Sequence, residues 1–154
     1  MKKLAIVAFV GVVLLGLRAW VPTVLAATKH HFIVSPYTLY RADNELYFNN
    51  ELPNNIEVIE SEIPGAEIDF QKDGGIDVGD TAHQPGTHWY KIYISPTFNL
   101  TTTDERETVL HEACHVKMWE IAEKHELPYD GGHGPEWQAC MLDLAKKGAF
   151  ADLW

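Results

Sequence analysis

The chain has 154 residues, with 12 basic and 22 acidic side chains and a formal net charge of −10. Its apolar share of 46% and aromatic share of 11% predict a folded protein with one core and exclude a disordered acidic chain. A nucleic-acid-binding surface would need a basic patch, so the acidic balance predicts no nucleic-acid partner.

Residues 1–26 have the features of a secretory signal peptide. A basic start precedes an uncharged apolar run over residues 4–17, which is short for a membrane span, and a cleavage pattern ends at Ala26. We predict cleavage after Ala26 and export to the periplasm or the medium. The alternative is an uncleaved N-terminal anchor, and only in that case do we expect the chain at a membrane. The segment has no acidic residue, so residues 27–154 keep 9 basic against 22 acidic side chains, hence a net charge of −13.

Residues 27–154 contain no repeat or long linker and predict one domain. The apolar spacing over residues 36–50 predicts a helix. Two short alternating stretches, residues 56–60 and 66–70, predict strands separated by a Pro-Gly turn.

Residues 72–87 hold four of the eleven glycines and predict a surface loop. The strand signal is strongest at residues 88–95, where aromatic and β-branched side chains gather. We expect this strand at an edge of the sheet, where it would bind an extended substrate through backbone hydrogen bonds.

Two helices are predicted after this strand. Thr102 followed by Glu105 matches a capping box and starts a helix that runs to about residue 125. Pro135 suits the first position of a second helix, which ends at Lys147. A helix, a small antiparallel sheet and two helices make an α+β fold.

The first of these two helices contains the sequence HEACH at residues 111–115, which matches the HExxH motif. Histidines four positions apart lie on one face of a helix, so His111 and His115 can reach the same cation. Glu112 projects beside them and can take a proton from a water that a metal activates. The motif therefore predicts one catalytic Zn²⁺ ion, with Glu112 as the general base.

A catalytic zinc ion usually has a third protein ligand. His133 lies in the segment GGHGPEW, whose glycines let the backbone bring an imidazole close to the metal, and we favour this residue. Glu136 is the alternative, although its place at the start of a helix also suits the helix dipole. Tyr129, near this segment, is a possible oxyanion stabiliser, but a packing role is the simpler interpretation.

The chain has two cysteines, Cys114 inside the motif and Cys140 on the last predicted helix. In an exported protein a disulfide between them would join the two helices. Two buried thiols acting as small hydrophobic side chains are the alternative.

HEACH followed by GGHGPEW resembles the SprT-like zinc metallopeptidases, which have a Spartan-type catalytic domain. The phrase FNNELP at residues 48–53 is similar to the end of the first helix of that family, and IYISP at residues 92–96 is similar to its strand before the zinc helix. The resemblance spans roughly residues 37–147.

The resemblance implies a zincin-like fold, endopeptidase activity on polypeptides, one Zn²⁺ held by His111, His115 and His133, and Glu112 as the catalytic base. The sequence given ends at Trp154 with no counterpart of the family's DNA-binding extensions, so we expect its catalytic centre without a role on DNA. A zinc-dependent hydrolase of cell-wall peptide or amide bonds and an inactive zinc-binding module are the alternative functions.

Overall fold

The computed structural model describes residues 34–63 and 78–151, which all belong to one unit, His31–Trp154. The predicted signal peptide and the strand expected at residues 66–70 lie outside the described residues. The elements follow the order α1 (Pro36–Tyr47), β1 (Glu57–Glu60), β2 (Gly79–His83), β3 (Tyr90–Ile94), α2 (Thr102–His125) and α3 (Pro135–Lys146). This part of the chain therefore has the predicted α+β fold.

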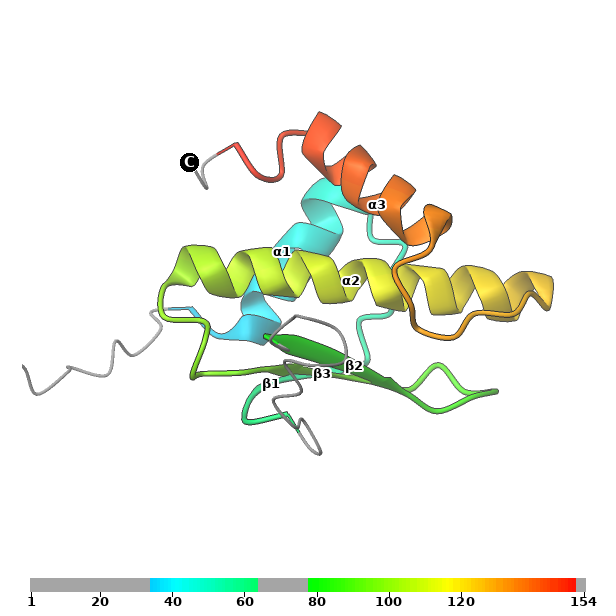
Figure 1. The fold of residues 1–154 in the computed structure, drawn as a ribbon, viewed down its shortest axis with the longest axis horizontal. Coiled ribbons are helices and arrows are strands. Elements are labelled where there is room, and N and C mark those ends of the chain that lie inside the picture. The colour runs from blue at the N-terminus through cyan, green and yellow to red at the C-terminus, as the bar shows by residue number, and fades with distance from the viewer. Residues whose placement is uncertain (1–33, 64–77, 152–154) are drawn as a thin grey trace, which may run out of the picture. The chain divides into compact units, whose positions relative to one another are not determined.

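The three described helices lie on the same side of the sheet (Figure 1). α2 runs across the sheet, α1 packs beside it, and α3 packs on the side of α2 that faces away from the strands. An ion pair between Arg106 of α2 and Asp43 of α1, 3.0 Å long, ties these two helices together. Among the described residues, no helix is both long enough and apolar enough to cross a membrane.

The sheet is mixed, whereas the sequence predicted an antiparallel one. β3 lies in the middle of the order β1-β3-β2, antiparallel to β2 and parallel to β1. The short connection from β2 to β3 forces those two strands to run in opposite directions, and β1 pairs with the remaining edge of β3.

The expectation that residues 88–95 form an edge strand is therefore wrong. Tyr90, Ile92 and Ile94 are fully buried beneath the helices, and the strand with the largest apolar side chains takes the central position. Among the described strands β1 and β2 take the two edges instead, and β2 lies within residues 72–87, where the sequence predicted a loop.

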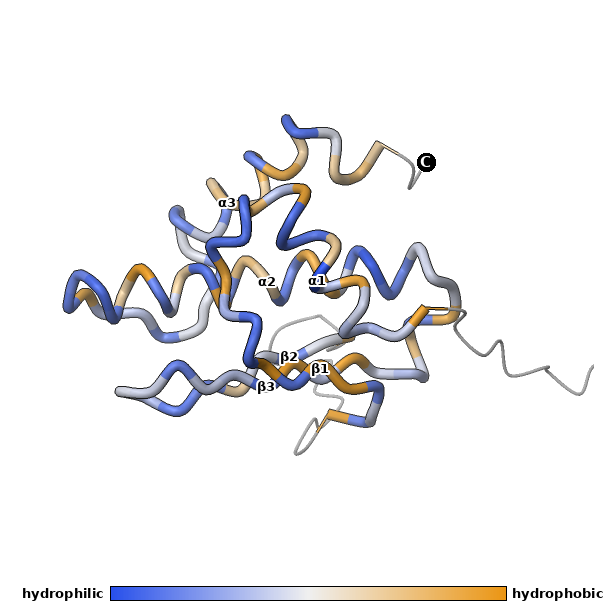
Figure 2. Tube along the Cα trace, turned by 180° about the vertical axis from the view of Figure 1, so that it is seen from behind, coloured by the Kyte–Doolittle hydropathy of each residue, from blue (hydrophilic) through white to orange (hydrophobic). Residues whose placement is uncertain are grey.

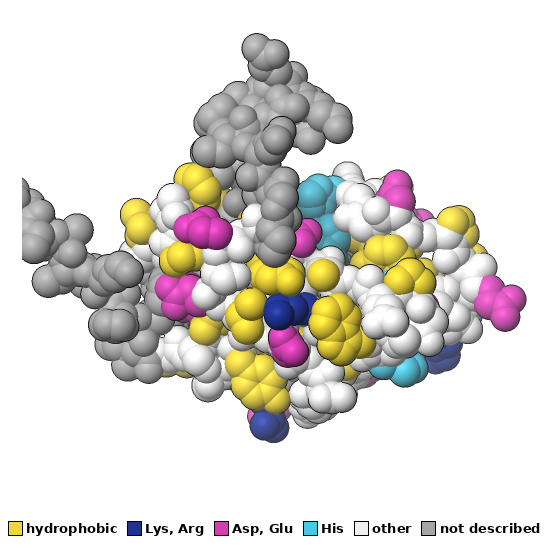
Figure 3. Space-filling model, turned by 90° about the horizontal axis from the view of Figure 1, so that it is seen from below, with side chains coloured by type: hydrophobic (Ala, Val, Ile, Leu, Met, Phe, Trp, Pro, Cys, Tyr) yellow, Lys and Arg dark blue, Asp and Glu magenta, His cyan; other side chains and the backbone are white. Residues whose placement is uncertain are grey.

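The core fills the space between the sheet and the helices. Hydrophobic stretches recur along β1, β3 and α2 (Figure 2). None of the described helices lies on the opposite face of the sheet, and hydrophobic side chains surround a few charged ones there (Figure 3). An ion pair of 2.9 Å joins Lys91 of β3 to Glu57 of β1.

α2 begins one residue earlier than its predicted capping box. The hydroxyl of Thr101 accepts a hydrogen bond from the backbone N–H of Asp104, and the Asp104 carboxylate accepts one from the backbone N–H of Thr101. Since these two residues cap the helix, the predicted pair of Thr102 and Glu105 is wrong. The side chain of Glu105 is instead buried in the core.

Candidate metal centre

α2 presents His111 and His115 toward the sheet side of the molecule, one helical turn apart. The two Nε2 atoms are 3.3 Å apart. His115 is buried and His111 is half-buried, because α2 packs against the strands along this stretch. The spacing in HExxH thus brings two imidazole nitrogens together, as predicted.

His133 reaches the same point from the loop between α2 and α3. Gly131 has a positive φ of 82°, which favours glycine, and Pro135 occupies the first turn of α3, so the chain turns sharply around His133. The Nε2 atom of His133 is 3.2 Å from that of His115 and 3.0 Å from that of His111.

These three nitrogens fit a tetrahedral metal ion. Two ligands bound at about 2.0–2.1 Å to a tetrahedral ion are separated by about 3.3 Å, which is close to the observed separations. Among the described residues, the three histidines form the one cluster of potential ligands close enough to hold a metal ion. Glu136, the alternative third ligand, is not part of it and lies in the first turn of α3.

The imidazoles of His111 and His115 are neutral at neutral pH. Burial, and after it the neighbouring imidazole of His133, lowers the pKa of His111 to about 4. Burial and the two other histidines lower the pKa of His115 to about 3. A neutral imidazole has a lone pair for a metal, so the surroundings favour metal binding over protonation.

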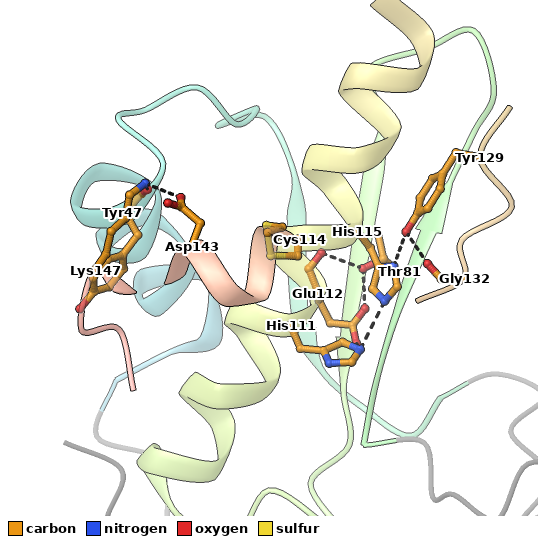
Figure 4. The surroundings of a disulfide bond; sticks show 11 residues. Tyr47, Thr81, His111, Glu112, Cys114, His115, Tyr129, Gly132, Asp143 and Lys147 are labelled. Atoms are coloured by element: carbon orange, nitrogen blue, oxygen red, sulfur yellow. Dashed lines mark hydrogen bonds and ion pairs between the residues drawn. A yellow bond between two sulfur atoms is a disulfide. The ribbon is translucent and has the colours of Figure 1, made fainter. Parts of the chain in front are cut away.

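Glu112 lies beside the histidines, with its carboxylate buried between α2 and β2 (Figure 4). The hydroxyl of Thr81 donates a hydrogen bond of 2.7 Å to Oε2, and Oε1 lies 3.9 Å from Nε2 of His111. A Cβ atom added at Gly79 would be 2.9 Å from Oε1 and 2.5 Å from the methyl carbon of Thr108. β2 therefore orients the carboxylate through Thr81 and approaches α2 closely because Gly79 has no side chain.

The sequence did not single out Thr81 or Gly79, since both fall in the predicted loop. The alternation of a small residue and a hydroxyl residue at these positions is too common to indicate a site. The strand pairing with β3 is what turns both residues toward α2.

A cavity of about 390 Å³ opens in front of the histidines. Its walls come from β2, α2 and the loop after α2. The lining residues are Val78, Gly79, Asp80, Thr81, His111, Glu112, His115, Trp119, Asp130, Gly131 and His133. The site is thus accessible to a ligand along one side of the edge strand.

Two aromatic residues contact the histidine cluster. The indole of Trp137 contacts all three imidazoles, with ring centroids 4.6 Å from His111, 5.5 Å from His115 and 4.3 Å from His133. The hydroxyl oxygen of Tyr129 lies 2.7 Å from Nδ1 of His115, and burial raises the pKa of this phenol to about 12. Since that hydroxyl lies on the edge of the His115 ring away from Nε2, Tyr129 does not face the cavity as an oxyanion stabiliser would.

A disulfide joins Cys114 of α2 to Cys140 of α3. Of the two alternatives for these cysteines, the structure contains the bond. This α2–α3 disulfide links the helix that carries two of the histidines to the helix that follows the third.

Comparison with known proteins identifies one family. The model of the SprT-like family matches residues 37–151, a range that includes all the described helices and strands except Pro36, the first residue of α1. No curated protein matches the chain significantly. The match covers the three histidines and Glu112, the residues that the sequence motifs had brought forward.

Proposed function

The chain belongs to the SprT-like family, and on this basis we propose that it is an exported zinc-dependent metallopeptidase. The observation that carries the proposal is the convergence of three Nε2 atoms within 3.3 Å of one another, next to a buried carboxylate. In a structural zinc site four protein ligands usually fill the coordination shell, whereas three protein ligands beside an accessible cavity suit a catalytic site.

His111, His115 and His133 would hold the zinc ion, since imidazole nitrogens in this arrangement suit it well. When bound, zinc supplies Lewis-acid chemistry, which polarises a carbonyl group and lowers the pKa of a water molecule. The remaining steps belong to side chains of this chain.

Glu112 acts as the general base. Its Oε1 atom, on the side of the histidines, accepts a proton from the attacking water and afterwards passes it to the nitrogen of the leaving amine. The hydrogen bond from Thr81 occupies Oε2 and directs Oε1 toward the site. Trp119 and the loop around Asp130 border the cavity and limit the access of water.

β2 is the strand that we propose for substrate binding, in place of β3. Its residues line the cavity, and among the described strands only β3 pairs with it. An extended polypeptide can add to such an edge through backbone hydrogen bonds, which places a peptide bond in front of the histidines.

Export is supported by two features. The N-terminal segment has the pattern of a signal peptide, and the α2–α3 disulfide is typical of proteins that fold in an oxidising compartment. The acidic charge supports a polypeptide substrate rather than a nucleic acid.

The test compares wild type with Glu112→Gln, using an unfolded protein and peptidoglycan as substrates and metal analysis of both variants. We expect zinc in both, and cleavage of the unfolded protein that falls roughly 10²–10⁴-fold in the variant. Glu136→Gln serves as the control, because it removes a carboxylate near the site without touching the histidine cluster.

The outcomes separate the possible functions. Cleavage of peptidoglycan alone would make the protein a cell-wall hydrolase, and bound zinc without any cleavage would make it a binding module. Equal activity in wild type and Glu112→Gln would refute the mechanism. Zinc content unchanged in His133→Ala would show that another residue is the third ligand.

A further inference from the structure

Tyr129 lies between two parts of the metal centre, one on α2 and one on the loop that carries His133. Its hydroxyl oxygen is 2.7 Å from Nδ1 of His115 and 3.2 Å from the carbonyl oxygen of Gly132. His115 uses its other nitrogen, Nε2, to face the remaining histidines. The phenol therefore contacts the site from behind the ligand ring, as Figure 4 shows.

The directions of the two hydrogen bonds follow from their partners. The carbonyl of Gly132 can only accept, so the single hydroxyl hydrogen of Tyr129 is donated to it. The hydroxyl oxygen then accepts a hydrogen bond from His115, which must carry its ring hydrogen on Nδ1. In a neutral imidazole Nε2 then has no hydrogen, and its lone pair is directed at the metal position.

The position of the phenol is itself well defined by packing. Its ring meets the indole of Trp119 edge to face, with centroids 4.8 Å apart. The loop after Tyr129 turns back through Gly131, and the backbone N–H of Gly132 donates to the carboxylate of Asp130 at 2.9 Å. The hydroxyl therefore joins two ordered segments.

We propose that Tyr129 is a positioning residue of the metal centre, whose hydroxyl holds His115 in the Nδ1–H tautomer and ties the His133 loop to α2. The inference rests on the proposed function, because it concerns the same zinc site. Outer partners of metal-binding histidines typically strengthen metal binding about 10–100-fold. Tyr129→Phe loses the hydrogen bonds to His115 and to Gly132, so we expect its zinc dissociation constant to rise about tenfold or more.

The experiment titrates Zn²⁺ into the chelator-stripped full chain in competition with a fluorescent chelator. Tyr129→Phe keeps the ring and its contact with Trp119 and removes only the hydroxyl. Tyr40→Phe is the matched control, because its hydroxyl donates to the carbonyl oxygen of Pro53, away from the metal centre. We expect weaker zinc binding in Tyr129→Phe alone, while the melting temperature of the zinc-free chain shows whether that variant is folded.

A second measurement uses the wild type and does not depend on any variant folding. NMR of the zinc-free, ¹⁵N-histidine-labelled chain should show His115 with its hydrogen on Nδ1, because no metal is then present to fix the tautomer. A hydrogen on Nε2, or a zinc affinity of folded Tyr129→Phe within about twofold of wild type, would overturn the inference. If the wild type itself bound no zinc, the proposed function would fail first, so the two failures are distinguishable.

Combining Tyr129→Phe with His133→Ala resolves how the hydroxyl acts. If it orients His115, the loss of zinc affinity persists when His133 is absent, and we expect this result. A loss confined to the chain that retains His133 would overturn the tautomer part of the proposal.

Discussion

The buried carboxyl group of Glu105 makes the stability of the protein depend on pH. It lies in the first turn of α2, and neither of its oxygens has a hydrogen-bond partner in the part of the chain that the structure describes. Burial, and to a smaller extent the nearby Glu60, raise its pKa from 4.5 to about 7. Glu105→Gln removes the charge and keeps the shape, so we expect this variant to be more stable than wild type at alkaline pH.

The magnitude follows from the two pKa values. Glu105 ionises near 4.5 in the unfolded chain and near 7 in the folded one, so the folded chain binds the proton more tightly. The stabilising effect of the neutral form is complete below the unfolded pKa and is lost as the pH rises through the folded pKa. Since one pKa unit corresponds to about 1.36 kcal/mol, the difference between the two pKa values limits the loss of folding free energy at alkaline pH to about 3 kcal/mol. The helix dipole and water near the protein surface reduce this to about 1–2 kcal/mol.

Urea unfolding of zinc-free wild type and Glu105→Gln, followed by tryptophan fluorescence, measures the effect. The variant should gain about 1–2 kcal/mol over wild type at about pH 8 and almost nothing at about pH 4. Glu107→Gln, which changes an exposed carboxylate on the same helix, should show a difference that does not vary with pH. If the difference for Glu105→Gln were equally independent of pH, or if the variant were less stable at alkaline pH, the reasoning would be refuted.

Three further predictions concern the supports of the metal centre. Thr81→Val removes the hydrogen bond to Glu112, so the carboxylate binds its proton more tightly. The acid limb of the pH–rate profile should therefore move to higher pH, and cleavage should fall roughly tenfold. An acid limb at the wild-type pH would contradict this. Gly79→Ala brings a Cβ atom to 2.5 Å from the methyl carbon of Thr108 and should cost about 1–3 kcal/mol in urea unfolding, unless β2 can shift freely. Alanine at both positions of the α2–α3 disulfide, which closes a loop with a sequence separation of 26, should lower the free energy of unfolding by about 3 kcal/mol; a variant as stable as wild type would refute this.

The histidine cluster could be predicted because its arrangement depends on local geometry. A spacing of four residues on a helix brings His111 and His115 together whatever the rest of the fold does. His133 could be chosen over Glu136 because glycines surround it and a proline follows, and such a segment can turn an imidazole back toward a helix. The α+β fold was equally accessible, since apolar spacing and proline at the helix starts signal the elements directly.

The partners of these residues could not be predicted, because they depend on contacts between distant segments. Thr81 bonds to Glu112 across 31 positions, and Tyr129 bonds to His115 across 14. A lone hydroxyl carries no pattern that specifies its acceptor. β2 was hidden for a similar reason: the sequence GDTAH lacks the large β-branched side chains that indicate a strand, and pairing with β3 supplies what local preference does not.

The structure assigns each function of the site a separate support, and this separation makes the reasoning testable. The Thr81 hydroxyl donates to the proposed base, so its loss should alter the pH dependence of catalysis while zinc stays bound. Tyr129 contacts a ligand and the loop of another, so its loss should change zinc affinity. The α2–α3 disulfide joins two helices, so its loss should lower the free energy of unfolding before it changes zinc affinity or catalysis. All three variants could instead lower catalysis and zinc affinity only as far as they lower the free energy of unfolding. The site would then be a single cooperative unit, and the separate roles argued for these residues would be wrong.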